Sequence, residues 1–319
     1  MTRRLIDVQV EGYVPHAIHG GDRVWTETNC YVDLWVEVLH ALRLDPVPAA
    51  ACAFSARFDG SQWTFLKFKP EDLFALYGIE VAEMNVWRRP VEHLEANAEA
   101  GLLSTVEVDA FWLPDTGGTG YRTEHSKTTI VPNLIDAESE VLEYFHNSGY
   151  HRLAADDFRG VFGLDDPLPT WPPYIEQVRL GVSVPECDAF DAVVRRHLRN
   201  RSTVNPVRAL AERVLEDLEQ LSSGGMELFH RWTFGVLRQC GASAELAADV
   251  CDYMENHGYP GTAKAAPGFR SVSEAAKSVQ FRMARAARGR TVDPAEQLDR
   301  MADAWDESIT TAARAAGSR

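Results

Sequence analysis

Residues 107–136 read EVDAFWLPDTGGTGYRTEHSKTTIVPNLID, and this stretch decides the fold that we expect for the first half of the chain. The run over 103–113 is nearly continuous in apolar and β-branched residues, which predicts a buried strand. The glycines within 114–121 predict a loop. Two further strands are expected over 126–131 and 141–145, joined by a short turn, so that neighbouring strands run antiparallel.

Other elements of the first half follow from the same kind of pattern. Apolar residues recur at helical spacing over Cys30–Leu44, which predicts a helix with Asn29 or Thr28 as its N-cap. Hydrophobic runs around an Asp-Gly pair predict a β-hairpin with strands over 51–58 and 63–68. Short helices are expected over 71–77, 90–100 and 153–162.

The second half has a different character, because helical periodicity replaces the strand-like runs from Cys187 onward. We expect six helices, over 188–200, 206–221, 226–240, 243–257, 271–288 and 294–314. The changeover is placed within 175–186. The chain is therefore predicted to be α+β, with a mixed domain over 1–180 and a helical domain over 181–319.

The composition is that of a globular protein. Of the 319 residues, 45% are hydrophobic and 25% are charged, and no run reaches the roughly 18 apolar residues of a membrane span. The chain starts without an apolar signal segment, so the cytosol is the expected compartment. Its 32 basic and 47 acidic residues give a net charge of −15, which disfavours nucleic acids and anionic membranes as partners.

The five cysteines are scattered, form no CxxC pair and do not suggest a disulfide framework. Four of them are expected to be small buried hydrophobic residues. His16 and His19 stand close together, yet no second pair completes a zinc-ligand set. We therefore expect no structural metal and no cofactor, and metal-dependent hydrolysis through His16 and His19 is the weakest of the alternatives.

Cys30 is the cysteine that stands apart, because it opens the first long helix. The start of a helix carries unpaired N–H groups and the positive end of the helix dipole, which favour a thiolate and can bind an oxyanion. His125 begins a strand after the glycine-rich loop, and His146 and Asn147 close the next strand. A cysteine at a helix start, with a histidine and an orienting Asn or Asp on adjacent strands, is the arrangement of Cys-His-Asn enzymes. The alternative is a cysteine that only packs, beside a structural histidine.

The stretch 107–136, together with EVLEYFHNSGYHRLAADDF over 140–158, resembles an uncharacterised bacterial family, and this resemblance covers nearly the whole chain. Members of that family are found beside ligases that are related to seryl-tRNA synthetase and load amino acids onto carrier proteins. More remotely, residues 15–160 are similar to the butirosin-pathway acyltransferase and to bacteriocin-processing cysteine peptidases. This similarity implies a papain-like fold, with an antiparallel sheet and a nucleophile helix, and it matches Cys30 to the nucleophile and His125 to the catalytic histidine.

The sequence departs from the pattern of those enzymes in the orienting residue. Asp109 and Leu113-Pro114 match the first strand, but the aspartate expected after the second strand is replaced by His146-Asn147. Because an asparagine can orient a histidine, we favour Asn147 over His146 for this role. The candidates for substrate binding are Asn29, Asp109, Asp115, Tyr121, Arg122 and Lys127, and the last four could equally form ion pairs that hold the loop.

The activity that the resemblance implies is cysteine-dependent acyl transfer in natural-product biosynthesis. Cys30 would take an aminoacyl group from the phosphopantetheine thioester of an acidic carrier protein and pass it to a small amine, with His125 as the base. The same triad would serve a hydrolase, namely a peptidase, amidase or thioesterase, and a non-catalytic carrier-binding protein is a further alternative. Two arginine clusters are docking candidates or, as charge runs more often are, solvated helix faces: Arg195, Arg196, Arg199 and Arg201, and Arg282, Arg285, Arg288 and Arg290.

Overall fold

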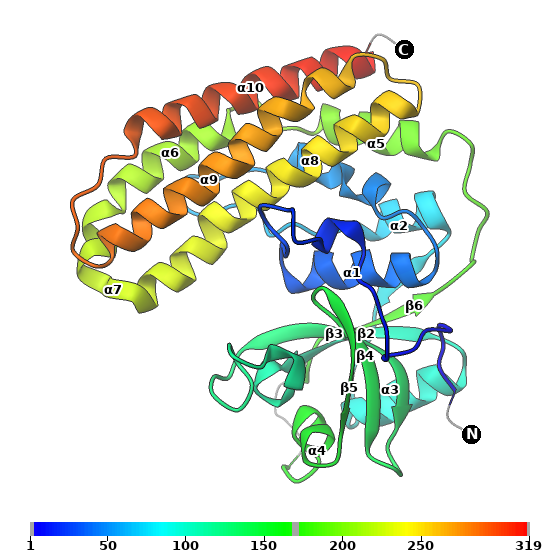
Figure 1. Ribbon diagram of the computed structural model, residues 1–319. Helices are drawn as coiled ribbons and strands as arrows, with labels where there is room; N and C mark the ends of the chain where they lie inside the picture. Colours follow the sequence, from blue (N-terminus) through cyan, green and yellow to red (C-terminus); the bar gives the residue numbers. More distant parts are fainter. Residues whose placement is uncertain (1–2, 168–171, 318–319) are drawn as a thin grey trace. The chain divides into compact units, whose positions relative to one another are not determined.

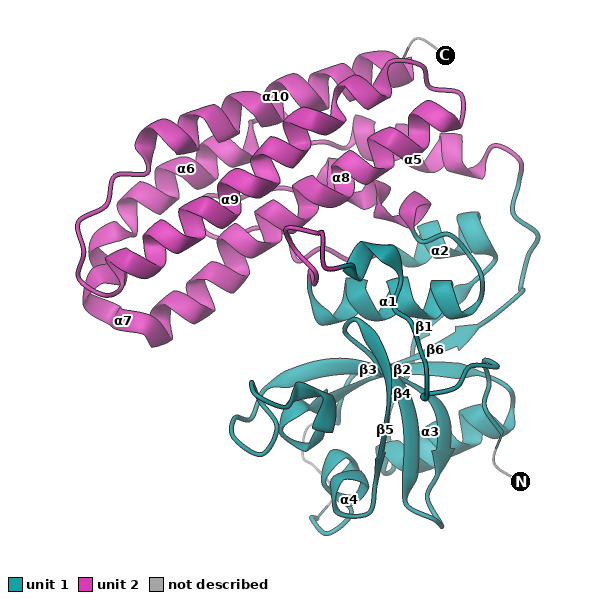
Figure 2. Cartoon of the chain, in the orientation of Figure 1, with its two compact units in different colours: residues 1–20, 29–46, 69–186 teal, residues 21–28, 47–68, 187–319 magenta. Residues whose placement is uncertain are grey.

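A computed structural model describes residues 3–167 and 172–317 of the chain (Figure 1). Its contacts divide the chain into a mixed unit and a helical unit, which confirms the α+β class (Figure 2). The mixed unit comprises 1–20, 29–46 and 69–186. The helical unit comprises 21–28, 47–68 and 187–319, so two segments of the first half belong to it.

The mixed unit is built on a six-stranded sheet with the order β1-β6-β2-β3-β4-β5, in which neighbouring strands are antiparallel. Sequence patterns predict the three strands β2, β3 and β4. They miss β1, β5 and β6, which are only four to six residues long. β5 and β6 mix buried with half-buried or exposed side chains, and the side chains of β1 are half-buried or exposed. The strands are β1 Glu80–Glu83, β2 Leu103–Asp109, β3 Lys127–Asp136, β4 Val141–His146, β5 Gly149–Ala154 and β6 Ile175–Arg179.

The two faces of the sheet have different partners, because successive side chains of a strand point to opposite faces. On one face, Val106 and Ile130 join a hydrophobic core with side chains of α3 and α4. The other face carries α1, which packs against β3, β4 and β5 (Figure 1). The helices of this unit are α1 Cys30–Ala41, α2 Pro70–Tyr77, α3 Pro90–Glu99 and α4 Asp156–Phe162.

The helical unit contains the six helices predicted for the second half of the chain. Its α8 is buried along most of its length and packs against α9 and against the 3₁₀ segment Val47–Ser55. A five-residue π-helical turn, Phe234–Arg238, leads from α7 into α8. The helices are α5 Ala189–Arg199, α6 Pro206–Glu216, α7 Leu218–Thr233, α8 Gln239–Asn256, α9 Ala266–Ala286 and α10 Ala295–Gly317.

The hairpin predicted over 51–68 is wrong. Residues Val47–Ser55 form a 3₁₀ helix, and within the described residues of the predicted hairpin a single bridge pairs Phe58 with Trp63. The first run is rich in alanine, which has a low strand propensity and a high helix propensity. Its small side chains also suit the close packing against α8. A short apolar run does not by itself distinguish a strand from a buried helix.

Candidate active site

Cys30 is the first residue of α1, as the sequence predicts. The side chain of Asn29 caps the helix by accepting hydrogen bonds from the amides of Tyr31 and Val32, both at 3.1 Å. The Oδ1 atom of Asn29 is therefore committed to the helix start, and the substrate-binding role of Asn29 stays a prediction. The thiol is partly exposed, and its Sγ lies 3.9 Å from Oγ1 of Thr129 on β3.

His125 precedes β3 by two residues and is held by Asp109, the last residue of β2. Its Nδ1 lies 2.6 Å from Oδ2 of Asp109, and its ring stacks on Phe111 with a centroid separation of 4.3 Å. The other carboxylate oxygen, Oδ1, accepts hydrogen bonds from the amides of Phe111 and Ser126. The His125 side chain is 71% exposed. An imidazole held at Nδ1 by a carboxylate has its Nε2 free to act as a base, which is the geometry of a histidine general base.

The register of β2 against β3 shows which side chains share the face of the sheet that α1 covers. Thr129 contacts Cys30, so it faces α1, and residues directly opposite one another in antiparallel strands share a face. Glu107 stands opposite Thr129, and Asp109 stands opposite Lys127. Lys127 Nζ lies 2.5 Å from Glu107 Oε1. Lys127 is thereby paired with Glu107, and its predicted role in substrate binding is not tested by this contact.

Cys30 and His125 mark the two ends of one polar row. Four residues of β-chain, about 13 Å, separate Thr129 from His125. In the described part of the chain no hydrogen bond joins Cys30 to His125. The row consists of Cys30, Thr129, Glu107, Lys127, Asp109 and His125.

Asn147, the residue expected to orient His125, lies in the tight turn between β4 and β5 with a φ of +46°. The side chain that contacts Nδ1 of His125 is Asp109 instead. The sequence predicts that Asp109 binds a substrate amine or braces the loop. It does not predict the pairing with His125, because that pairing depends on sheet register and on the course of the loop over 110–124. The orienting role of Asn147 stays a prediction.

His146, the alternative orienting residue, belongs to a buried network on the opposite face of the sheet. Its Nδ1 lies 2.5 Å from Oδ2 of Asp115, and its Nε2 lies 2.7 Å from Oγ1 of Thr128. Tyr144 donates its hydroxyl to the other oxygen of Asp115. Burial alone would raise the pKa of the Asp115 carboxyl, but His146 and Tyr144 outweigh it and hold that pKa below its ordinary value. Asp115 thus anchors the glycine-rich loop to β4.

Tyr121 and Arg122 anchor the same loop to α4. The Tyr121 hydroxyl donates to Asp157 at 3.0 Å, and Arg122 pairs with the same carboxylate at 2.5 Å. The guanidinium of Arg122 also lies 4.2 Å from the ring centroid of Trp112. Gly160 permits Trp112 to approach α4, since a Cβ at this position would lie 2.1 Å from the indole. These contacts hold the loop, and the substrate-binding roles of Tyr121 and Arg122 stay predictions.

A cavity of about 520 Å³ opens beside the polar row. Asp109, His125 and Lys127 line one side, and Gly160–Gly163 at the end of α4 lines another. Volumes of this size accommodate small ligands. The cavity therefore gives a substrate access to the imidazole of His125.

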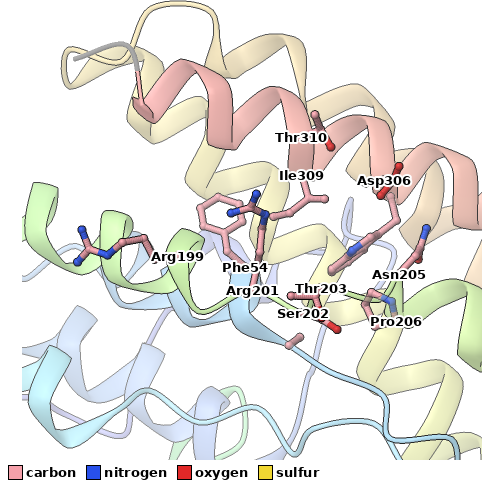
Figure 3. A pocket seen from close by; sticks show the side chains of 12 residues that line it. Phe54, Arg199, Arg201, Ser202, Thr203, Asn205, Pro206, Asp306, Ile309 and Thr310 are labelled. Atoms are coloured by element: carbon pink, nitrogen blue, oxygen red, sulfur yellow. The ribbon is translucent and has the colours of Figure 1, made fainter.

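A second cavity, of about 470 Å³, lies within the helical unit (Figure 3). Arg201 and Asp306 are among its lining residues. Arg201 also donates to the carbonyl of Leu198 at the end of α5, and Arg195 pairs with Asp191 one turn earlier. These two members of the first arginine cluster thus have structural tasks.

A buried ionic cluster that the sequence did not reveal includes Asp33 and Glu37 of α1. Nδ1 of His19 contacts Glu37, Nε2 lies 3.5 Å from Asp33, and Tyr13 donates its hydroxyl to Glu37 at 2.5 Å. Burial opposes the charge on His19, but the two carboxylates outweigh it and raise its pKa to about 9. Two acids spaced i, i+4 in an otherwise apolar helix were the available signal. The cluster ties the N-terminal segment to α1.

Within residues 3–167 and 172–317, no three His, Cys, Asp or Glu side chains are grouped so that they could hold a metal ion. His16 accepts the amide of Ile18 through Nδ1, whereas His19 pairs with Glu37, so the two histidines have separate tasks. Across the same described residues, no helix combines the length and the apolar character that a membrane crossing needs.

Comparison with known proteins places two family models end to end on the chain. The model of the DUF1839 N-terminal domain matches residues 14–180, and the model of the DUF1839 C-terminal domain matches residues 184–314. The junction between the two matches lies next to the boundary predicted between 180 and 181. Among curated proteins, no match to the chain is found.

Proposed function

The chain belongs to the DUF1839 family, and we propose that it is a cysteine-dependent acyltransferase with a papain-like mixed domain. The observation that carries the proposal is the polar row. It runs along β2 and β3, from a thiol at a helix start to a histidine that is paired with an aspartate. The resemblance to the butirosin-pathway acyltransferase is the reason to propose an aminoacyl group as the group transferred and a carrier protein as its donor. Asp109 takes the orienting role in this proposal, because it is the residue in contact with His125.

The reaction would proceed in two half-reactions, first acylation of Cys30 and then transfer of the acyl group to an amine. His125 takes the proton of the Cys30 thiol, and the thiolate attacks the thioester carbonyl of an aminoacyl-phosphopantetheine arm. The C–S bond to the arm breaks, and the departing thiolate receives the proton from His125. An amine then attacks the Cys30 thioester, forms an amide and gives its proton to His125, which returns it to the thiolate of Cys30.

The row is open in this structure, so the first half-reaction requires Cys30 and His125 to approach. The separation of about 13 Å along the strand exceeds a lengthened catalytic hydrogen bond, so this approach is a rearrangement of the chain that must accompany substrate binding. The acyl group and the carrier arm would lie beside the row, over the interval between Thr129 and His125. Glu107 and Lys127 lie in that interval, where they would contact the bound arm or acyl group.

Hydrolysis is the second candidate, and the exposure of His125 favours it. An imidazole that is 71% exposed can activate water as readily as an amine. A peptidase, amidase or thioesterase would share the acyl-enzyme and differ only in the acceptor. Product analysis with and without an amine acceptor distinguishes transfer from hydrolysis.

Intact-protein mass spectrometry after incubation with aminoacyl carrier proteins is the direct test. We expect an aminoacyl-sized mass increase on the wild-type protein, none on Cys30→Ala and a much slower increase on His125→Ala. Cys187→Ala, which removes the exposed cysteine of the helical unit, is the matched control and should behave as wild type. No adduct from any donor, together with an unreactive Cys30 thiol, would favour a non-catalytic carrier-binding protein.

The carrier partner has a candidate docking surface at the end of α9. Arg282, Arg285, Arg288 and Arg290 are exposed, and Phe281, the residue before Arg282, is 64% exposed. A basic surface with an exposed aromatic group complements an acidic protein, and it contrasts with the net charge of −15. We refer to these five residues as the α9 arginine face.

Charge reversal at the α9 arginine face is expected to weaken carrier binding. The double change Arg285→Glu and Arg288→Glu should raise the dissociation constant of a carrier protein at least about tenfold at low salt, with a smaller effect at high salt. Arg314→Glu, an exposed arginine of α10, is the control. Isothermal titration at two salt concentrations measures the effect, and equal affinities of the two variants would contradict this docking surface.

A further inference from the structure

The segment Gly21–Thr28 leads into the nucleophile helix, yet it belongs to the helical unit (Figure 2). Both carboxylate oxygens of Glu245 on α8 accept backbone amides of this segment, from Val24 at 3.0 Å and from Trp25 at 2.9 Å. Glu245 is buried. A buried carboxylate that accepts hydrogen bonds from two consecutive amides satisfies both donors and fixes the course of the backbone.

Side-chain contacts hold the start of the segment to the same helix. Arg23 pairs with Asp249 at 2.7 Å, and the buried ring of Trp25 lies beneath Lys277, with Nζ 4.1 Å from the centroid. Gly241 allows Trp25 to lie against α8, because a Cβ there would be 2.4 Å from the indole nitrogen. The first part of the segment is thus anchored by several independent contacts.

The last residue of the segment is held by two donors at once. The carbonyl of Thr28 accepts from Nε2 of Gln239 at 3.0 Å and from Nε of Arg238 at 3.2 Å. Thr28 and Gln239 are both buried. Arg238 ends the π-helical turn Phe234–Arg238, and Gln239 begins α8. π-helical turns change the direction of side chains and recur at functional sites, and here the turn brings two consecutive side chains to one carbonyl.

We propose that Gln239 and Arg238 are positioning residues for Cys30, a role that rests on the function proposed for this thiol. The Thr28 carbonyl and the Asn29 amide belong to one planar peptide group, so fixing one fixes the other. Asn29 caps α1, and Cys30 follows directly. The two donors therefore set the orientation of the peptide from which the nucleophile helix starts. The helical domain acts on the reaction through this connection.

The test measures the reactivity of Cys30 itself, so it does not depend on knowing the acyl donor. Gln239→Met keeps the length of the side chain and removes the donor, and Gln280→Met on α9 is the matched control. Each protein is treated with iodoacetamide, and the alkylation rate of every cysteine is followed by peptide mass spectrometry. We expect Gln239→Met to slow alkylation of Cys30 about threefold to tenfold. The exposed Cys187 should react at an unchanged rate.

The buried cysteines distinguish positioning from a loss of packing. Cys52, Cys240 and Cys251 lie in the helical unit and are buried, so loosening of that unit would make them reactive. Positioning predicts that they stay protected while Cys30 slows. An unchanged or faster Cys30, or a change shared by the buried cysteines, would overturn the proposal. If Gln239→Met folds poorly, the alkylation rate of Cys30 is measured in Arg238→Met instead, which changes a partly exposed position.

Failure of this inference and failure of the proposed function give different results. If Gln239→Met slows alkylation but no carrier thioester ever acylates Cys30, the positioning role stands and the acyltransferase proposal falls. If wild-type Cys30 is acylated and Gln239→Met is acylated and alkylated at the wild-type rate, the acyltransferase stands and Gln239 has no positioning role.

Discussion

Asp109→Asn is expected to reduce the rate of Cys30 acylation at least about 100-fold while the fold stays intact. The exchange is conservative for the backbone, because Oδ1 accepts the amides of Phe111 and Ser126 and an asparagine oxygen can accept both. It is not conservative for His125, whose Nδ1 faces the other carboxylate oxygen. An amide nitrogen there would donate to Nδ1 and move the ring proton to Nε2, which could then no longer act as a base. Amide-for-carboxylate exchanges of this kind cost serine proteases about 10⁴-fold.

Because the His125 side chain is exposed, we expect a smaller loss of rate than the loss of about 10⁴-fold in serine proteases. A side chain that is 71% exposed can rotate and exchange its tautomer through water, so part of the activity should persist. Rapid-quench mass spectrometry of the acyl-enzyme gives the rate, and thermal unfolding checks that the midpoint stays within a few degrees of wild type.

Asn147→Ala is the matched comparison, because the sequence favours Asn147 for the same role. We expect it to change the acylation rate less than about threefold, since Asn147 lies in the β4–β5 turn and Asp109 already occupies Nδ1. A large loss with Asn147→Ala and none with Asp109→Asn would restore the triad proposed from the sequence. It would also require a rearrangement of the loop over 110–124.

Residue patterns predict the helices and strands that depend on local periodicity and capping. The helix start at Cys30, the three strands around the glycine-rich loop and the six helices of the second half all follow from periodicity and capping. The strand predicted over 51–58 overlaps the 3₁₀ helix Val47–Ser55, because buried apolar runs look alike in either structure. β5 is missed, and its last two residues fall within the short helix predicted over 153–162.

Long-range contacts determined what the sequence could not supply. The assignment of 21–28 to the helical unit rests on contacts with residues more than 200 positions away, such as Glu245. The pairing of His125 with Asp109 requires the register of β2 and β3 and the return of the loop between them. Residue types therefore identified both members of that pair as functional candidates but could not assign them to each other.

His19→Gln is expected to lower the free energy of unfolding by about 3–5 kcal/mol, the largest stability loss that we predict for a single residue. Glu37 is fully buried and Asp33 nearly so, and His19 supplies the positive charge between them. Removing one partner of a buried ion pair leaves an uncompensated buried charge, which costs more than the pair itself contributes. Urea unfolding at pH 6.5 measures the loss, and His40→Gln, on the same helix and bonded to Val14, is the control that should cost at most about 1 kcal/mol.

The pH dependence of stability gives an independent signature of the same cluster. The pKa of His19 is raised from its ordinary 6.5 to about 9 in the folded protein, so its contribution is complete below pH 6.5 and is lost as the pH rises through 9. This shift corresponds to about 3 kcal/mol. Glu37 acts in the opposite direction: its pKa is lowered despite burial, so its contribution is present above the ordinary value of 4.5 and lost in acid.

The difference between wild type and His19→Gln isolates this effect from that of other histidines. His16, His93 and His151 have lowered pKa values, so their contributions change below pH 6.5 and are nearly constant above it. Between pH 6.5 and 9 the two proteins should therefore converge, as the wild type loses what the variant already lacks. A constant difference across that range would mean that His19 is uncharged in the folded protein and that the carboxylates of α1 are neutralised by protonation instead.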